Sequence, residues 1–245
     1  MGLHETEAFV LRTYKLAEAD KIVALLTRSA GVVRGVARGA RKLKSRFGAS
    51  LEPYTLVSLS YYEKEARELV SIRQTEILRS YFHLATEAET VAGLDYLGEL
   101  ILEFVPPHDP NEKLFRMVRA CMDAIADTPI DTDGIVRYFE VWLLKLSGFL
   151  PDVRACASCR RQFRADLFLS ADSTLQCAPC AQGRGLRLST EARTRLRAIL
   201  HTAPGVWARE GREAAQETQQ QLALLTRQLI ARSLERFPRS RHAEK

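Results

Sequence analysis

Two Cys-x-x-Cys pairs constrain the fold of this chain more than any other feature of its sequence. Cys156 and Cys159 form the first pair, Cys177 and Cys180 form the second, and seventeen residues separate the pairs. Two cysteines three positions apart on a tight turn can direct both sulfurs at one ion, and two such turns complete a tetrahedral shell of four sulfurs. The spacing predicts one structural zinc ion, with no open coordination position for water or a substrate.

Disulfide bonds, or a module that has lost its metal, are the alternative interpretation of these cysteines. The chain opens with MGLHETEAF, which lacks the basic and apolar segments of a secretory signal. We therefore expect a cytoplasmic protein whose thiols stay reduced. No apolar run approaches the ~18 residues that a membrane helix needs, so we expect no membrane span.

Charge is distributed unevenly along the chain. Residues 1–80 carry 14 Lys and Arg against 9 Asp and Glu, residues 81–150 carry 5 against 12, and residues 151–245 carry 17 against 9. Two basic ends therefore flank an acidic middle. This distribution predicts a polyanionic partner for at least one of the basic ends.

The first eighty residues follow a β-strand pattern. Alternating or short apolar runs recur through this stretch at the density of a small barrel. The predicted fold is a five-stranded OB-type barrel, and an SH3-like barrel is the alternative that strand counting leaves open. The runs are Ala8–Leu11, Ile22–Thr27, Val32–Ala37, Tyr54–Tyr62 and Leu69–Ile72.

A basic segment, residues 34–46, is called the basic loop below. Six cations fall within it and no acid interrupts them. Guanidinium and ammonium groups bind phosphate oxygens, so the cluster predicts a contact with a nucleic-acid backbone, and a solvated surface loop is the alternative. The cations are Arg34, Arg38, Arg41, Lys42, Lys44 and Arg46, and the nearby aromatic residues Phe47, Tyr54, Tyr61 and Tyr62 are candidates for base stacking or for the core.

After Leu78 the apolar period changes from two to about 3.6, which predicts a helical region over residues 81–245. The cysteine module, defined here as residues 152–184, is predicted to interrupt this region as a structural insertion. Cys121 lies on an apolar helical stripe and is predicted to pack in the core. One helix is predicted to end at Pro106-Pro107, a second to begin at Asp109-Pro110, and a third to run from Thr132 to Gly148. A fourth is predicted to begin after a Ser189 cap and to break at Ala203-Pro204-Gly205, and the last to run from Glu213 to Arg236.

No motif for catalysis is present in the sequence. The histidines are scattered, and no metalloprotease, phosphate-binding or nucleophile-elbow pattern occurs. The aspartates at 123, 127, 131 and 133 are predicted to cap helices and face solvent, with a two-metal nuclease site as the alternative. We therefore expect a binding protein and not an enzyme.

Several of these segments resemble a known bacterial family. Residues 14–27 and 37–53, which contain the basic loop and its Leu-Glu-Pro exit, resemble the amino-terminal signature of the RecO recombination mediators. Residues 146–151 and the two Cys-x-x-Cys pairs resemble the helical domain and zinc module of the same family. The resemblance spans the whole chain.

The resemblance implies an α+β protein with an OB-fold domain over residues 1–80 and a helical domain over residues 81–245, interrupted by the cysteine module. It implies a non-catalytic, nucleoid-associated DNA repair protein that binds single- and double-stranded DNA and anneals complementary strands. Implied partners are RecR, the acidic C-terminal tail of single-strand binding protein and, indirectly, the RecA recombinase. The six cations of the basic loop would face DNA, and the four paired cysteines would hold zinc. A zinc-ribbon module that binds RNA or a transcription or translation partner is the alternative.

Overall fold

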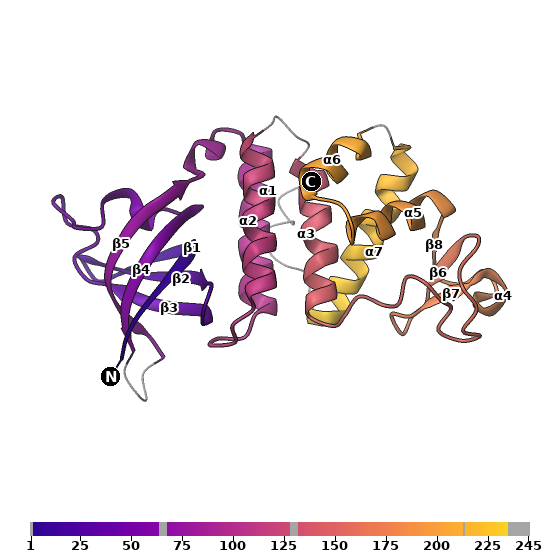
Figure 1. Ribbon diagram of the computed structural model, residues 1–245, viewed down its shortest axis with the longest axis horizontal. Helices are drawn as coiled ribbons and strands as arrows, with labels where there is room; N and C mark the ends of the chain where they lie inside the picture. The colour runs from indigo at the N-terminus through magenta and orange to yellow at the C-terminus, as the bar shows by residue number, and fades with distance from the viewer. Residues whose placement is uncertain (1, 64–67, 128–131, 213, 235–245) are drawn as a thin grey trace. The chain divides into compact units, whose positions relative to one another are not determined.

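The computed structural model describes residues 2–63, 68–127, 132–212 and 214–234, and Figure 1 labels its helices and strands. The chain divides into two compact units, Met1–Arg116 and Met117–Lys245. The last strand of the first unit ends at Ser80, the position of the predicted domain boundary. The compact unit continues to Arg116 because the following helical segment packs on the strands: the rings of Phe9 and Phe115 lie 5.3 Å apart.

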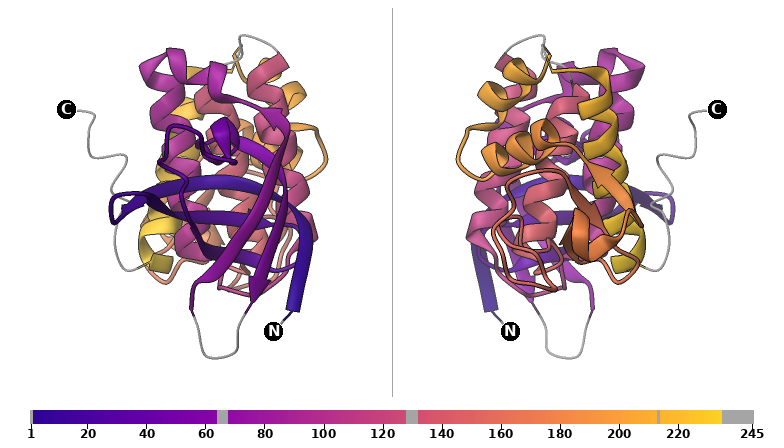
Figure 2. Two further views of the ribbon diagram at one scale, coloured as in Figure 1. Left: turned by 90° about the vertical axis from the view of Figure 1, so that its left-hand side faces the viewer. Right: turned by 90° about the vertical axis from the view of Figure 1, so that its right-hand side faces the viewer.

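Five strands of the first unit form a closed barrel in the order β1-β2-β3-β5-β4, which the left view of Figure 2 faces. All neighbouring strands are antiparallel except β3 and β5, which are parallel. Each predicted apolar run lies within or largely overlaps one strand, so the prediction of five strands is confirmed. The strands are β1 (Gly2–Leu16), β2 (Asp20–Thr27), β3 (Gly31–Ala37), β4 (Thr55–Glu63) and β5 (Val70–Ser80).

The length and curvature of β1 close the barrel. Its first half pairs with β4 and its second half pairs with β2, and the register shifts between Val10 and Arg12. An irregularity of this kind bends a strand and increases its twist, so one strand can serve two neighbours that face different directions. Barrel closure removes the exposed edges that an open sheet would present to other chains.

Gly35 allows β3 to pair with β5, the contact that closes the barrel. It pairs with Val70 where β3 meets β5, and a Cβ atom at this position would lie 2.8 Å from Ile72 Cγ1 and 2.9 Å from Val70 Cγ2. Any side chain at Gly35 would therefore push β3 and β5 apart. The sequence thus places a glycine at the point where the two backbones pair.

A glycine, Gly31, begins β3 directly after the turn that follows β2. Gly31 has a φ of +61°, and a Cβ atom there would lie 2.3 Å from the carbonyl oxygen of Asp109. Thr27 secures the turn, because its hydroxyl donates to the Gly31 carbonyl at 2.9 Å and accepts from the Ala30 N–H at 3.0 Å. Gly31 is thus required both by its backbone conformation and by its surroundings.

The first unit also contains two 3₁₀ helices and the α-helix α1. These elements are η1 (Gly48–Leu51), η2 (Phe82–Thr86) and α1 (Ala88–Phe104). α1 stops two residues before Pro106, as the sequence predicts. Tyr54 ties the barrel to this helix, since its hydroxyl donates a hydrogen bond to the Asp95 carboxylate. Burial, followed by that bond, raises the pKa of Tyr54, so the phenol stays protonated.

α2 (Glu112–Asp127) begins in the first unit and ends in the second. The predicted start of this helix at Asp109-Pro110 is too early: the Asn111 side chain accepts from the Leu114 N–H at 3.0 Å and caps the helix two residues after Asp109. Cys121 on this helix is fully buried, with its sulfur 3.8 Å from that of Met117. Burial raises the pKa of the Cys121 thiol, which confirms a packing role.

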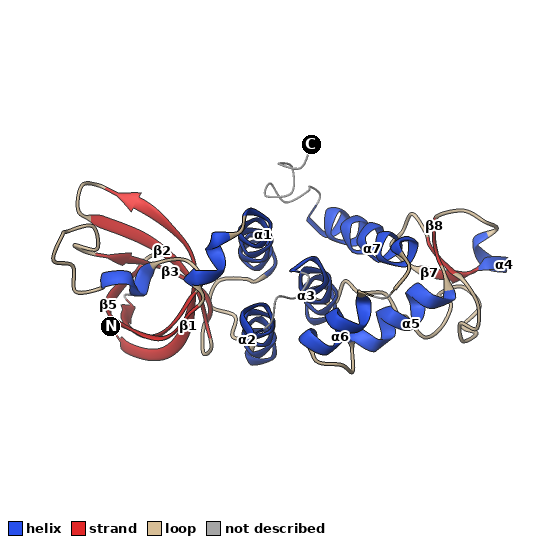
Figure 3. Ribbon diagram, turned by 90° about the horizontal axis from the view of Figure 1, so that it is seen from above, coloured by secondary structure: helices blue, strands red, loops and turns tan. Residues whose placement is uncertain are grey.

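The second unit is built around α3 (Thr132–Leu146), which contacts α5 (Thr190–Ile199), α6 (Pro204–Gly211) and α7 (Gln216–Leu234), as seen in Figure 3. α3 is followed by Gly148 with a φ of +79°, as predicted. Pro204 does end the helix before it, but it also begins α6, because proline suits the first helical turn. The predicted ends of the last helix, 213 and 235–236, and the basic tail after them lie outside the described residues.

A buried polar network joins α3 to α7. Arg137 donates to Glu140, and the hydroxyl of Thr226 donates to the same carboxylate at 2.7 Å. Glu140 has no exposed surface and Arg137 is 9% exposed. A buried carboxylate needs such partners, and removal of the arginine would leave an uncompensated charge in the core.

A three-stranded antiparallel sheet, in the order β7-β6-β8, joins the cysteine module to the segment that follows it, because β6 and β7 lie within the module and β8 lies directly after it. β8 leads directly into α5, and Ser189 caps that helix by accepting from the Ala192 N–H at 3.1 Å, as predicted. The short elements are β6 (Leu167–Leu169), β7 (Leu175–Cys177), α4 (Ala178–Ala181) and β8 (Leu186–Leu188).

Candidate metal centre and nucleic-acid interface

The four cysteines predicted as ligands lie together. Their sulfur atoms are all within 4.8 Å of one another, and those of Cys159 and Cys177 are 3.7 Å apart. Cys156 is buried, Cys159 is exposed, and Cys177 and Cys180 are intermediate. All five cysteines of the chain are described and are free thiols, so the arrangement is a cluster of four sulfurs that can hold a metal ion.

Backbone hydrogen bonds shape the first turn of this cluster. The Arg160 N–H donates to the Cys156 carbonyl at 3.0 Å, and the Cys156 N–H donates to the Arg161 carbonyl at 2.9 Å. The Ala157 N–H donates to the Leu175 carbonyl at 2.9 Å, which brings the two turns together. The geometry of the sulfurs is therefore fixed by the protein backbone.

The same backbone favours a thiolate at Cys156. Burial opposes its ionisation, but the N–H groups of Cys159, Cys177 and Ser158 outweigh burial and lower the pKa of Cys156 to about 6. The Cys177 N–H lies 3.4 Å from the Cys156 sulfur. Hydrogen bonds with Cys177 and Cys159 raise the pKa of Cys180 to about 12. Closely spaced thiolates repel one another, and a bound cation is the group that offsets this repulsion.

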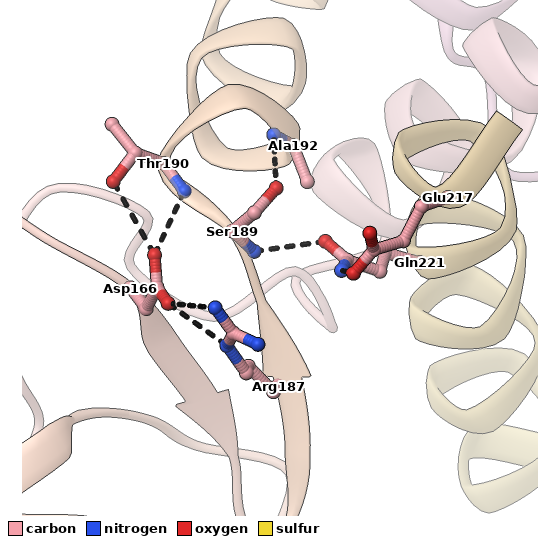
Figure 4. A network of polar contacts seen from close by, with 7 residues as sticks. All are labelled: Asp166, Arg187, Ser189, Thr190, Ala192, Glu217 and Gln221. Carbon is pink, nitrogen blue, oxygen red and sulfur yellow. Dashed lines mark hydrogen bonds and ion pairs between the residues drawn. The ribbon is translucent and has the colours of Figure 1, made fainter. Parts of the chain in front are cut away.

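A network of polar contacts fastens the cysteine module to the helices of the second unit (Figure 4). Asp166 forms an ion pair with Arg187 at 2.7 Å and accepts from the Thr190 N–H at 3.1 Å. Arg187 first, and then Thr190, lower the pKa of Asp166. The Gln221 side chain accepts from the Ser189 N–H at 2.8 Å and so joins the start of α5 to α7.

α7 makes a second connection to the module. Arg232 donates to the Ser170 carbonyl at 2.8 Å and to the Ser173 hydroxyl at 3.2 Å. Together with the network around Asp166, this contact makes the module part of the second unit and supports its predicted role as an insertion that stabilises the helices.

The six predicted DNA-facing cations are all exposed. Arg34 lies within β3, and the others lie in the connection between β3 and η1. Within the described part of the chain, Arg34, Arg38, Lys42 and Lys44 form no ion pair with an acid. These charges are therefore available to an anionic partner.

The basic loop is pinned to the hairpin between β1 and β2. The Gly39 N–H donates to the Asp20 carboxylate at 2.7 Å, and the Arg41 N–H donates to the Ala19 carbonyl at 2.9 Å. The Arg41 guanidinium also donates to the Ala17 carbonyl at 2.8 Å. Arg41 therefore positions the loop in addition to carrying charge.

The loop is also held at its far end. Phe47 is 3% exposed and belongs to the barrel core, with the Arg46 guanidinium 4.9 Å from the centre of its ring. A segment with one end pinned by hydrogen bonds and the other by a buried ring presents its cations in a defined arrangement, which lowers the entropy lost on binding.

The candidate stacking residues divide into two groups. Phe47 and Tyr61 are buried in the barrel core, and Tyr54 is committed to Asp95. Tyr62 is intermediate in burial and has the Arg73 guanidinium 6.0 Å from its ring centre. Of the four, Tyr62 keeps the most suitable position for a base.

Sequence reasoning missed one exposed residue of the loop. Leu43 is 102% exposed and is flanked directly by Lys42 and Lys44. The signal available in the sequence was an apolar residue between two lysines in a segment without acids.

No second group of metal ligands accompanies the cysteines in the described part of the chain. Asp123 and Asp127 lie in the last turns of α2 and Asp133 in the first turn of α3, whereas Asp131 lies outside the described residues.

No described helix has the length and apolar composition required to cross a bilayer.

Comparison with known proteins decides the family. Residues 1–81 match the family model described as "Recombination protein O N terminal", and residues 85–242 match "Recombination protein O C terminal". The chain belongs to the RecO family. The first match covers the barrel and the basic loop, and the second covers the helices and the four cysteines, so both candidate sites lie in RecO-family regions.

Curated RecO proteins cover most of the chain. A protein of Koribacter versatilis named DNA repair protein RecO is 34% identical over 80% of this chain and 79% of its own length. The protein of the same name from Anaeromyxobacter sp. (strain K) is 33% identical over 80% and 77%. That of Bifidobacterium animalis subsp. lactis is 36% identical over 66% and 68%. The similarity of this RecO-family chain thus extends through both compact units.

Proposed function

We propose that this protein acts in DNA repair as a non-catalytic, DNA-binding recombination mediator. The observation that carries the proposal is the pinned basic loop, whose exposed cations have no acidic partner in the described chain. Family membership supplies the repair context, since the similar proteins are named DNA repair proteins. The proposed ligands are single- and double-stranded DNA.

The barrel supports this proposal through its topology. The strand order β1-β2-β3-β5-β4 with one parallel contact suits an OB-fold, a five-stranded barrel that commonly binds oligonucleotides. The basic loop leaves this barrel at the end of β3. A cationic segment on such a barrel contacts the sugar-phosphate backbone and therefore binds without regard to base sequence.

Charge neutralisation accounts for the proposed annealing activity. Two complementary strands repel through their phosphates, and lysine and arginine side chains that displace counterions reduce this repulsion. The loop cations Arg38, Lys42 and Lys44, with Arg34 on the adjoining strand, would hold the backbones. No step of this process requires a nucleophile or a general base.

We propose that the four cysteines hold one structural zinc ion. Zinc–sulfur bonds of about 2.3 Å in a tetrahedron place sulfurs about 3.8 Å apart, close to the 3.7 Å between Cys159 and Cys177. The ion would cross-link the two turns of the cysteine module and so stabilise the adjoining sheet of β6, β7 and β8. With four sulfur ligands it would leave no position open for chemistry.

The proposed protein partners are RecR, the acidic tail of single-strand binding protein and, through them, RecA in a cytoplasmic, nucleoid-associated setting. A cavity of about 250 Å³ in the second unit offers a candidate site for the tail. Arg195 and Trp207 line this cavity with the guanidinium 4.5 Å above the ring, so a cation lies beside a largely buried aromatic side chain. An acidic peptide with an apolar side chain needs both.

A salt titration tests the proposed function. Binding of a fluorescein-labelled single strand by the full chain should weaken steeply between about 50 and 200 mM salt, by on the order of 10² if four phosphates are contacted and 10³ if all six cations take part. A flat salt dependence would contradict the proposal. Stronger competition by RNA than by single-stranded DNA would favour the zinc-ribbon alternative.

Matched variants locate the interaction. Arg38→Ala combined with Lys42→Ala should weaken binding to all DNA sequences about equally, because only phosphate contacts are lost. Arg161→Ala combined with Arg164→Ala removes two exposed arginines from the cysteine module and serves as the control. A larger loss in the control pair would move the DNA site to the second unit.

A further inference from the structure

Leu43 is the part of the basic loop that phosphate binding leaves unexplained. Its side chain is 102% exposed, so it packs on no other described residue. Single exposed leucines are common on proteins and need no explanation by themselves. The position of this one is unusual because cations with no acidic partner flank it on both sides.

The turn that carries Leu43 is held in place. The Lys42 N–H donates to the Gly39 carbonyl at 3.1 Å, directly after the contacts that pin Gly39 and Arg41 to the β1–β2 hairpin. Phe47 anchors the return of the chain to the barrel. The leucine is therefore presented to solvent by a defined turn, and it does not fold back on the barrel.

The neighbours of Leu43 restrict what it can contact. Lys42 and Lys44 lie one residue before and after it, both exposed, and their Cα atoms are at most about 7 Å apart. A partner must therefore offer two closely spaced negative charges with an apolar surface between them. Nucleic acid has this arrangement, because each nucleotide of a strand lies between two phosphates and carries a base with apolar faces.

We propose that Leu43 packs against the face of one base of the DNA strand held by the basic loop and separates it from the next base, while Lys42 and Lys44 contact the phosphates on either side of that nucleotide. This inference rests on the proposed DNA binding and adds a second kind of contact to the same site. Apolar side chains of proteins enter base steps in this way and unstack them. The bound strand is then locally opened, with its base edges free to pair with a complementary strand.

An oligonucleotide with 2-aminopurine in place of adenine tests the inference, since this base becomes fluorescent when it is unstacked. The wild-type chain should raise the fluorescence on binding, and Leu43→Ala should abolish most of the rise. Affinity should fall about tenfold because the buried apolar surface is lost. The slope of affinity against salt should not change, because no phosphate contact is removed.

Two further variants make the result specific. Leu43→Phe should keep the fluorescence rise, and Leu224→Ala, which changes an exposed leucine of α7, should behave as the wild type. Leu43 contacts nothing in the described chain, so its substitution leaves the barrel folded. Steep salt-dependent binding with an unchanged signal in Leu43→Ala would overturn the insertion alone and assign the leucine to a protein or membrane contact. Absence of DNA binding by the wild type would instead overturn the proposed function.

Discussion

The basic loop and the cysteine module are both irregular segments that leave a regular core, and they are fixed by different means. The loop is held by hydrogen bonds to the hairpin at Ala17–Asp20 and by the buried ring of Phe47. The module has strands of only three residues, and a cluster of four sulfurs that can hold a metal ion lies within it. A segment attached to a closed barrel needs few additional contacts, whereas a small segment with short strands and a small core gains stability from a cross-link.

The arginines and lysines of the two regions differ in whether they form ion pairs with acidic side chains. In the module, Arg154 pairs with Asp152 at 3.2 Å, and Asp166 pairs with Arg187 of the adjoining strand β8 at 2.7 Å. In the loop, Lys42 and Lys44 have no such partner among the described residues. Charge in the module thus contributes partly to structure, and charge in the loop remains for a ligand.

Metal removal should produce the largest effect and should separate the two regions. Treatment with a chelator, or Cys156→Ser, should lower the melting temperature by about 10 °C or more, because metal binding is coupled to folding of the module. Native mass spectrometry should find one zinc per wild-type chain and none in the variant. DNA affinity of the folded variant at low temperature should stay within about threefold of wild type, since the loop does not depend on the metal.

Phe47→Ala should show the next largest effect and should act on the loop. Loss of a buried phenylalanine costs about 3–5 kcal/mol of unfolding free energy, and the loop would also lose the anchor at its far end. Urea unfolding and a DNA titration should therefore both report a loss. Phe47→Leu is the control: a variant that recovers stability but not affinity would show that the position of the loop matters beyond the fold.

Lys42→Ala combined with Lys44→Ala should weaken DNA binding by about 10- to 100-fold at low salt and reduce the salt slope by about 2. Stability should change by less than about 0.5 kcal/mol, because both side chains are exposed and without an ion-pair partner in the described chain. Titration calorimetry at two salt concentrations measures the DNA affinity and its salt slope, and urea unfolding measures the stability. Retention of the full slope would mean that these lysines contact no phosphate.

Asp166→Asn should give the smallest effect, a loss of less than about 1 kcal/mol at pH 7, because the pair with Arg187 is largely exposed. Arg187 holds the pKa of Asp166 below its ordinary value of about 3.9 in the folded protein. The carboxylate therefore stabilises the fold above that value, and its contribution disappears as the pH falls through the lower folded pKa. Urea unfolding of wild type and variant should differ at pH 7 and converge as the pH falls below the folded pKa of Asp166.

Local patterns in the sequence predict much of this structure. The five strands, the end of α1 before Pro106, the glycine after α3 and the Ser189 cap each depend on residues close together in the chain. The sulfur cluster could also be predicted, because ligand spacing on two turns encodes the site directly. Each of these features is determined by the residues that form it, without contacts from distant parts of the chain.

The features that were not predicted depend on longer-range contacts or on very short elements. Arg41 gains its positioning role from the carbonyl of Ala17, which no local pattern connects to it. The strands of the module are three residues long, too short for a recognisable alternation. α6 was missed because Pro204 was interpreted only as the end of one helix, and proline equally suits the start of another.

The parallel seam of the barrel carries a consequence for motion. Only two register pairs, Gly35 with Val70 and Val36 with Ser71, join β3 to β5, whereas every other neighbouring pair shares a longer register. The least-paired edge of a structure opens at the lowest free energy. Backbone amides along this seam should therefore exchange with deuterium before those between β1 and β2. Since β3 ends one residue before Arg38, such breathing would reach the root of the basic loop first, and bound DNA should slow it.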